Sequence, residues 1–289
     1  MGERMGAGGE PREAIHDLPA LLALRAALAR LDPALPPTAL VAQPARAEGG
    51  AGAAVGILAG SFDPLTNAHG ALARAALDTG GLDALYFALS RRTVDKEGVL
   101  RPSQADRALV LCRYAECHPR HGALLFNRGL YAEQAQAARA AFPDAREVAF
   151  VVGFDKARQI FDPRYYEDRD AALGDLFGAV TLLVAPRGDD GAAELAALLE
   201  RPENRPYRAR VRPLPFDPAY AGDSATLVRE DARAGQSVAG LVPPETLAFL
   251  AEARPYDPPR WSDDGTQIDH YALREAAIEA LAARPVADR

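Results

Sequence analysis

Two short segments far apart in the chain carry the side chains best suited to hold a phosphate. The first, GSFDPLTNAH at 60–69, follows the apolar run AVGILA and precedes the alanine-rich segment ALARAAL. The second, SATLVR at 224–229, supplies two hydroxyls and a guanidinium at another predicted helix start. A strand that runs through a glycine turn into a helix presents backbone N–H groups to an anion. Two such helix starts predict one nucleotide site that the fold assembles.

Within the first segment, Gly60 ends the predicted strand where a side chain would obstruct a nucleotide; a plain tight turn is the alternative explanation. Ser61 and Phe62 are candidates to offer backbone N–H groups to phosphate, with a core position as the alternative for Phe62. Thr66 and His69 are about one helical turn apart, so both can face the same anion. There His69 would donate a hydrogen bond to a phosphate oxygen as charge builds up in a transition state. An isolated helical histidine is otherwise an ordinary surface or core residue.

The second segment offers further phosphate contacts. Ser224 and Thr226 are either phosphate ligands or simple helix caps, and Arg229, one turn inside, can neutralise the charge of a phosphate. Gly153 and Asp155 end another predicted buried strand. A carboxylate at that place accepts hydrogen bonds from ribose hydroxyls at other dinucleotide sites, and a helix N-cap is the alternative.

The predicted helix starts differ in their local capping. Ser103 and Asp106 have the spacing of a capping box, which gives the free N–H groups of that helix local partners. The starts at Thr66 and Ser224 have no acidic residue or glutamine three positions on. We therefore expect their N–H groups to be less fully capped, as a phosphate site requires.

Length, composition and net charge restrict the class of protein. A chain of 289 residues with 48% hydrophobic and 25% charged residues is ordinary for a globular protein with a sizeable core. The net charge of −7 argues against a non-specific nucleic-acid binder. Because no apolar run approaches the roughly 20 residues that span a bilayer, and the first residues have no apolar signal core, we expect a cytoplasmic protein without membrane contact.

Strand and helix signals alternate along the chain. This alternation predicts an α/β fold, a Rossmann-like parallel sheet with helices on both faces and ligands at the carboxyl ends of its strands. The sheet domain would cover 54–256, preceded by a helical extension and linker over 1–53 and followed by a linker and C-terminal helix over 257–289. The helix at 18–31 either packs on this domain or mediates association into a homo-oligomer. Predicted strands cover 54–59, 84–89, 123–127, 147–152, 180–185 and 209–214, and the other predicted helices cover 67–79, 103–117, 131–142, 190–200 and 269–283.

The two cysteines, Cys112 and Cys117, are five residues apart in one predicted helix, so they face different directions and are poorly placed to bridge. Cys117, His118 and His121 are conceivable metal ligands, but no second Cys/His pair with a usual zinc spacing follows. We therefore prefer a buried helix end followed by a polar loop.

Taken together, the two segments resemble the signatures of the nucleotidylyltransferase superfamily that contains the nicotinamide- and nicotinate-nucleotide adenylyltransferases. GSFDPLTNAH is similar to the first signature and SATLVR to the second, Ser-x-Thr-x-x-Arg. The strand ending FVVGFD and the Val-Pro segment LVPPETLAFLAEARPY agree in the same order, so the resemblance covers a nucleotidyltransferase domain at 54–256. Thr66 stands where many members have histidine, and Ala68 replaces a common glycine.

This resemblance implies small-molecule nucleotides as partners. It makes Lys96 a candidate ligand for a substrate phosphate, with a solvated charge as the alternative, and Arg107 a helix anchor. Because the 5′-phosphate of a mononucleotide is already a nucleophile, it would attack the α-phosphorus of ATP in line and expel pyrophosphate, with Mg²⁺ on the triphosphate.

The implied reaction joins ATP to nicotinamide or nicotinate mononucleotide. A sister transferase that uses phosphopantetheine or CTP, and a non-catalytic nucleotide-binding protein of the same fold, are the alternatives. Several aromatic residues offer a face to a pyridine ring, none of which the sequence singles out: Phe154, Phe161, Tyr165 and Tyr166.

Overall fold

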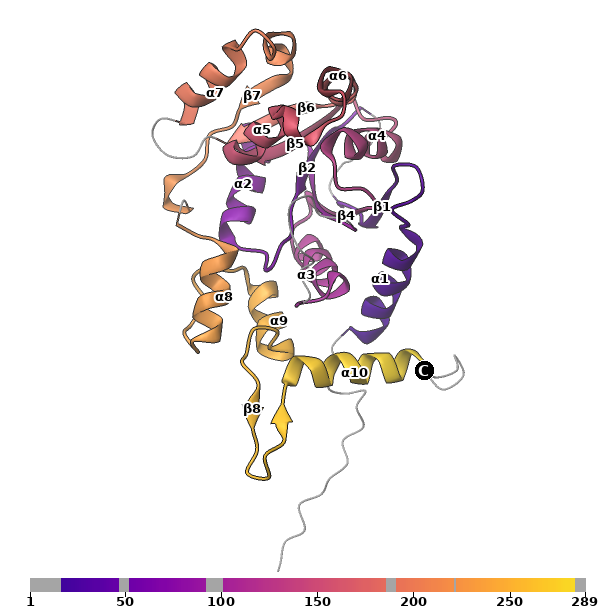
Figure 1. Ribbon diagram of the computed structural model, residues 1–289, viewed down its shortest axis with the longest axis vertical. Coiled ribbons are helices and arrows are strands. Elements are labelled where there is room, and N and C mark those ends of the chain that lie inside the picture. The colour runs from indigo at the N-terminus through magenta and orange to yellow at the C-terminus, as the bar shows by residue number, and fades with distance from the viewer. Residues whose placement is uncertain (1–16, 47–51, 92–100, 186–190, 221, 284–289) are drawn as a thin grey trace, which may run out of the picture.

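A seven-stranded sheet forms the centre of the computed structural model, which describes residues 17–46, 52–91, 101–185, 191–220 and 222–283 (Figure 1). Its strands are β1 (Ala39–Gln43), β2 (Ala54–Ala59), β3 (Ala84–Ser90), β4 (His121–Phe126), β5 (Glu147–Gly153), β6 (Thr181–Ala185) and β7 (Val211–Pro213). They lie in the order β1-β4-β3-β2-β5-β6-β7, and each neighbouring pair is parallel except β1 with β4.

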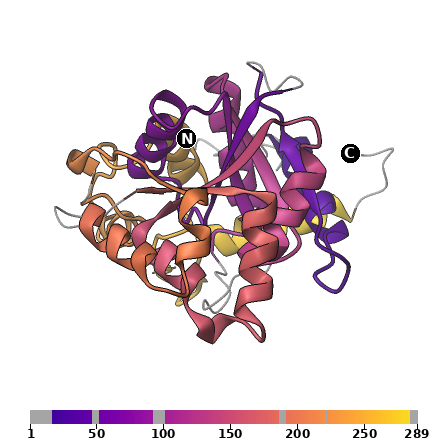
Figure 2. The same cartoon turned by 90° about the horizontal axis from the view of Figure 1, so that it is seen from above.

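Helices cover both faces of this sheet, as Figure 2 shows from above. The α-helices are α1 (Leu18–Arg30), α2 (Asn67–Asp78), α3 (Gln104–Cys117), α4 (Tyr131–Ala141), α5 (Phe154–Phe161), α6 (Arg169–Ala179), α7 (Gly191–Glu200), α8 (Ala225–Arg233), α9 (Pro244–Ala253) and α10 (His270–Ala282). Short 3-10 helices cover Pro163–Tyr165, Arg205–Arg210 and Pro218–Tyr220. The predicted Rossmann-like α/β fold is confirmed.

The alternation of side chains along the central strand separates two cores. Ala54 and Leu58 of β2 belong to a buried cluster formed with α1, α2, α3, α9 and α10. Val55 and Ile57 point to the other face and pack with α4, α5, α6 and α7. Because both faces are buried, the strand is apolar throughout, which explains why a continuous apolar run predicted it.

The order of the strands predicts where a ligand-binding crevice lies. β2 pairs with β3 on one side and with β5 on the other, so the direction of winding reverses at β2. In open α/β sheets ligands bind outside the carboxyl ends of the strands at such a reversal. Gly60 follows β2 and Gly153 ends β5, so the two predicted glycine turns lie on either side of this crevice.

Two segments differ from the predicted connectors. Within 33–53, β1 joins the sheet as an antiparallel edge strand, with Ala39 opposite Phe126 of β4. Within the predicted linker after 256, β8 (Arg260–Trp261) and β9 (Gln267–Ile268) form a small antiparallel pair. β1 pairs with a strand about 80 residues away in sequence, whereas β8 pairs with a strand a few residues away. Composition reports neither pairing.

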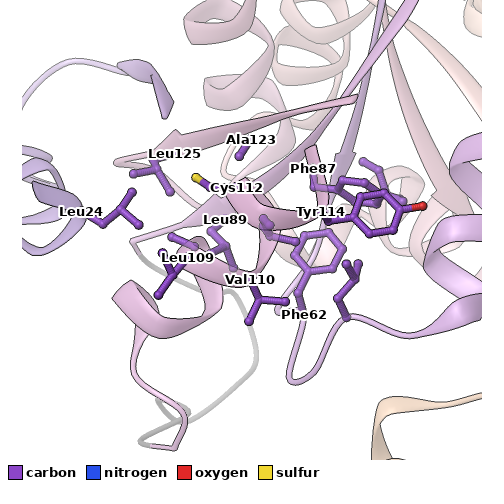
Figure 3. Close-up of a cluster of buried hydrophobic side chains, with 14 of the residues drawn as sticks. Leu24, Phe62, Phe87, Leu89, Leu109, Val110, Cys112, Tyr114, Ala123 and Leu125 are labelled. Carbon is purple, nitrogen blue, oxygen red and sulfur yellow. The ribbon is translucent and has the colours of Figure 1, made fainter. Parts of the chain in front are cut away.

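The N-terminal helix packs on the sheet domain. Leu21 of α1 is fully buried, and Leu24 lies in one cluster with Leu109 and Cys112 of α3 (Figure 3). Of the two roles expected for this helix, packing is therefore observed. Throughout the described ranges, the helices are too short or too polar to cross a membrane.

Candidate functional site

The turn after β2 is built around a buried aromatic ring. The Phe62 side chain is 3% exposed, and its ring meets Phe87 edge-on at 5.5 Å between centroids (Figure 3). A Cβ atom at Gly60 would lie 3.1 Å from this ring, tighter than an ordinary contact, so glycine suits the position where Phe62 folds back beneath the turn. Phe62 also adopts a left-handed backbone with φ of 44°, which a non-glycine residue tolerates only when its surroundings impose it. The Phe62 side chain therefore lies in the core, which is the alternative that the sequence analysis gave for this residue.

His69 caps the helix start that follows. The Thr66 backbone N–H donates to His69 Nδ1 at 3.0 Å, and Thr66 Oγ1 lies 2.8 Å from the same nitrogen. The expectation that this helix start lacks local capping was wrong, because a histidine at the third helical position does the work of the glutamate in a capping box.

This contact fixes the state of the His69 ring. Since Nδ1 accepts a hydrogen bond, the neutral ring carries its proton on Nε2. Burial lowers the pKa of His69 from 6.5 to about 4, so the ring is neutral at physiological pH. His69 therefore offers one N–H donor in a fixed tautomer.

Arg229 joins the two signature segments. Its Nη1 donates to the backbone carbonyl of Asp63 at 2.6 Å and lies 3.3 Å from Asp63 Oδ2. Its Nη2 donates to Thr226 Oγ1 at 3.0 Å. Ser224 is exposed and caps α8 by accepting from the Leu227 N–H at 3.1 Å, which is the simple cap that the sequence offered as its alternative role. The fold thus brings 60–69 and 224–229 into direct contact, as the sequence predicted.

Asp63 is the residue of this junction that sequence reasoning missed. Besides Arg229, its carboxylate accepts a hydrogen bond from the Tyr256 hydroxyl at 2.7 Å, and both residues are buried. On the same side, Thr246 Oγ1 donates to the Leu65 carbonyl at 3.1 Å. These contacts attach α9, through Thr246, and the segment after it, through Tyr256, to the turn. The signal was available, because Asp63 belongs to the first motif and Tyr256 ends the Val-Pro segment.

Arg107 anchors the turn from α3. Its Nη1 donates to the Ser61 carbonyl at 2.6 Å, and the residue is 4% exposed. Desolvation lowers the pKa of the Arg107 guanidinium, and the negative charge of Asp63 opposes that shift. Arg107 therefore holds the backbone of the candidate phosphate turn, the anchoring role expected for it.

A cavity of about 200 Å³ opens beside Gly60 and Ser61 at the carboxyl ends of the strands. Its aromatic and polar lining comes from the end of β3, from α4 and α5, and from the segment after α5: Ser90, Tyr131, Gln134, Lys156, Gln159, Tyr165 and Tyr166. Of the aromatic residues offered for stacking, Tyr165 and Tyr166 line this cavity, whereas Phe154 and Phe161 are buried in the core.

Three further residues were predicted to contact the mononucleotide: Gly153, Asp155 and Lys96. Gly153 is exposed and serves as the N-cap of α5. Asp155 is exposed in the first turn of α5, so it is not the N-cap residue itself, and it lines a charged depression next to the cavity. Lys96 lies in the range 92–100, outside the described residues.

Near the end of α3, His118 and His121 pack against aromatic rings. The His118 ring stacks on Tyr114 at 3.9 Å, and its Nδ1 lies 2.8 Å from the Tyr114 carbonyl oxygen. His121 is buried and stacks parallel to Phe87. Within the described ranges, no group of three or more His, Cys, Asp or Glu side chains is placed to hold a metal ion.

Two curated bacterial proteins are similar to this chain, and each is named probable nicotinate-nucleotide adenylyltransferase. The protein from Bordetella pertussis is 29% identical over 205 residues, which cover 68% of this chain and 94% of the relative. The protein from Symbiobacterium thermophilum is 29% identical over 211 residues, which cover 71% of this chain and 95% of the relative. The chain resembles the nicotinate-nucleotide adenylyltransferases.

Structure comparison agrees with this resemblance at the level of the fold. A solved structure of Plasmodium falciparum nicotinic acid mononucleotide adenylyltransferase complexed with NaAD superposes with a TM-score of 0.53 and 14% sequence identity. It covers 71% of this chain and 97% of its own. No protein-family model matches the chain. The resemblance to the nicotinate-nucleotide adenylyltransferases thus rests on the two relatives and the two motifs, and the fold accommodates it.

Proposed function

We propose that the protein is an adenylyltransferase that joins ATP to nicotinate or nicotinamide mononucleotide and releases pyrophosphate. The observation that carries this proposal is the contact of Arg229 with Asp63, which brings both signature segments together beside a cavity at the strand ends. Each segment alone suits many phosphate binders. In this proposal, their junction would present a histidine donor, a guanidinium and a helix start to one anion.

In this proposal the protein positions two nucleotides and neutralises charge. The 5′-phosphate of the mononucleotide attacks the α-phosphorus of ATP, a P–O bond forms, and the bond to the pyrophosphate leaving group breaks. His69 would donate from Nε2 to a non-bridging oxygen on which negative charge accumulates. Because Nδ1 is held by Thr66, the donor points in one direction before substrate arrives.

The ATP subsite would comprise the turn at Gly60, Ser61 and Phe62 together with the start of α8. Backbone N–H groups of the turn would contact phosphate oxygens, and Arg107 stabilises that backbone through the Ser61 carbonyl. Ser224, Thr226 and Arg229 would lie over the triphosphate. Arg229 would provide the strongest contact, because a guanidinium and a phosphate form charge-assisted hydrogen bonds.

We propose that the mononucleotide occupies the cavity lined by Tyr165 and Tyr166. Their rings offer the flat faces on which a pyridine stacks. Gly153 and Asp155, at the end of β5, are the proposed ribose contacts, and Lys96 is the proposed phosphate contact.

We propose that Mg²⁺ enters with ATP, carried by the triphosphate oxygens. The described residues offer no cluster of acidic or histidine ligands that would hold the ion by itself. When bound to the triphosphate, the ion would neutralise part of the charge on the leaving pyrophosphate.

A substrate panel tests the proposal. The purified full-length protein is incubated with Mg²⁺ and either ATP or CTP, against nicotinate mononucleotide, nicotinamide mononucleotide and phosphopantetheine, and products are separated by chromatography. We expect a dinucleotide from ATP and at least one pyridine mononucleotide. Product only with phosphopantetheine or only with CTP would assign a sister reaction, and no product with any pair would overturn the proposal.

A further inference from the structure

The C-terminal helix α10 lies across the beginning of α3. Figure 1 shows it below α3, between α9 and α1, and its Tyr271 is 3% exposed. The two bacterial relatives match nearly all of their own length but only 68% and 71% of this chain. The match therefore leaves part of this chain uncovered.

The contacts of α10 converge on one buried carboxylate. Asp106, in the first turn of α3, is fully buried. The Tyr271 hydroxyl donates to Asp106 Oδ2 at 2.5 Å and accepts from the Ser103 backbone N–H at 2.6 Å. Arg274 Nη1 donates to Asp106 Oδ1 at 2.9 Å. The Ser103 hydroxyl also donates to Asp106 Oδ2, at 2.8 Å. A buried charge is costly unless it is paired and hydrogen-bonded, so α10 supplies two of the three partners described for this carboxylate, including its ion-pair partner Arg274.

The capping box of α3 is completed by α10. The Ser103 side chain accepts from the Asp106 N–H at 3.2 Å, as the sequence predicted. In an ordinary capping box the acidic side chain returns to the N-cap backbone N–H. Here that N–H donates to Tyr271, so the position of the first turn of α3 depends on the C-terminal helix.

The next residue of α3 faces the candidate phosphate turn. Neighbouring residues on a helix point about 100° apart, so Asp106 and Arg107 contact different elements. Arg107 donates to the Ser61 carbonyl, and within the described residues its buried Nε has no hydrogen-bond partner. The placement of this guanidinium therefore depends on the helix turn that carries it, which α10 fixes from the other side.

We propose that Tyr271 and Arg274 are positioning residues for the phosphate-binding turn. They hold the first turn of α3 through Asp106, and Arg107 transmits that placement to Ser61. This inference rests on the proposed function for the identity of the ligand, which is the triphosphate of ATP.

Tyr271→Phe tests the inference, because it removes the hydroxyl and keeps the ring. In the full-length protein we expect the KM for ATP to rise by about tenfold, equivalent to about 1.4 kcal/mol, with a smaller change in the KM for the mononucleotide. Arg25→Ala is the matched control, since it breaks the 2.7 Å ion pair of α10 with α1 through Glu275. It leaves in place both the 3.3 Å pair of Glu275 with Arg274 and the contacts of Tyr271 and Arg274 with Asp106. It should leave the KM for ATP unchanged.

A double-mutant cycle separates positioning from general stability. If Tyr271 acts through Arg107, then Tyr271→Phe should add little to the KM for ATP in an Arg107→Lys background. Additive effects, or a change in thermal stability with an unchanged KM, would overturn the inference. Arg274→Lys replaces Tyr271→Phe in the cycle if that variant does not fold.

The positioning role of Tyr271 can be tested even if the proposed reaction is wrong. Should the wild-type protein form no dinucleotide, the reaction proposal fails, and direct titration of the wild-type, Tyr271→Phe and Arg25→Ala proteins with ATP and Mg²⁺ still tests the inference. Weaker binding in Tyr271→Phe alone supports it. Equal binding in all three proteins overturns it.

Discussion

At the scale of single residues, one histidine combines two tasks. His69 Nδ1 caps the start of α2 through the Thr66 N–H, and the same contact fixes the proton on Nε2. The sequence indicated His69 as a phosphate ligand through its spacing from Thr66 together with the resemblance of the motif to the family signature. It did not indicate the capping contact, because histidine is an uncommon partner at the third helical position, where glutamate or glutamine is usual.

Replacing His69 by alanine should separate turnover from binding. We expect kcat to fall by about 100-fold, since a preorganised donor to the transition state is removed, while the Kd for ATP changes much less. Steady-state kinetics and ATP titration on the same preparation measure both quantities. A pure nucleotide sensor would show no turnover to lose, and an equal loss of binding and turnover would contradict the role given to His69.

At the scale of elements, the turn after β2 is held from three sides. Arg107 of α3 holds Ser61, Arg229 of α8 holds Asp63, and Tyr256 after α9 holds the Asp63 carboxylate. The strands and helices that form this frame were largely predictable, since β2 covers the six residues of the apolar run AVGILA. The junction was not, because a hydrogen bond between residues 193 apart in sequence leaves no trace in local periodicity.

Elements without a local signal were also missed. β1 sits in a segment rich in proline, alanine and glycine, and its pairing with β4 creates the strand. α6 begins at an Asp168 cap that accepts from the Ala171 N–H, a signal that was present but was not used. Propensity thus identified the long apolar elements, whereas tertiary pairing determined the rest.

Tyr256→Phe should weaken the attachment of α9 to the turn. Removal of the hydroxyl leaves the buried Asp63 carboxylate with one donor fewer, so we expect the free energy of unfolding to fall by about 1–3 kcal/mol. Urea denaturation measures this change. Tyr220→Phe is the control, because among the described residues the Tyr220 hydroxyl makes one long, exposed contact, with Arg74 at 3.5 Å. The stability of this variant should stay within about 0.5 kcal/mol of the wild type. Equal stability of Tyr256→Phe and the wild type would show that this hydroxyl does not hold α9.

At the scale of the whole molecule, stability depends on keeping two histidines neutral. His121 is buried against Phe87, and within the described residues neither ring nitrogen has a hydrogen-bond partner. Burial lowers the pKa of His121 from 6.5 to about 4, and it shifts the pKa of His69 in the same direction. Both shifts oppose protonation of the folded chain.

The free energy of unfolding should therefore fall as the pH decreases from about 6.5 to about 4. In this window the unfolded chain binds protons at these histidines that the folded chain does not, at a cost of up to about 3 kcal/mol per site. Urea denaturation at pH 7 and pH 5 measures the loss. His121→Phe should make the loss smaller, because it removes one titrating group, and an unchanged loss would contradict the buried neutral state of His121.

The central claim is that two distant segments form one site for nucleotidyl transfer. Its most direct test is simultaneous measurement of pyrophosphate and dinucleotide from ATP, nicotinate mononucleotide and Mg²⁺, with the wild type, His69→Ala and Arg229→Ala. The account predicts one pyrophosphate per dinucleotide in the wild type and a large loss of both products in each variant. Pyrophosphate release without dinucleotide, or equal rates in all three proteins, would contradict it.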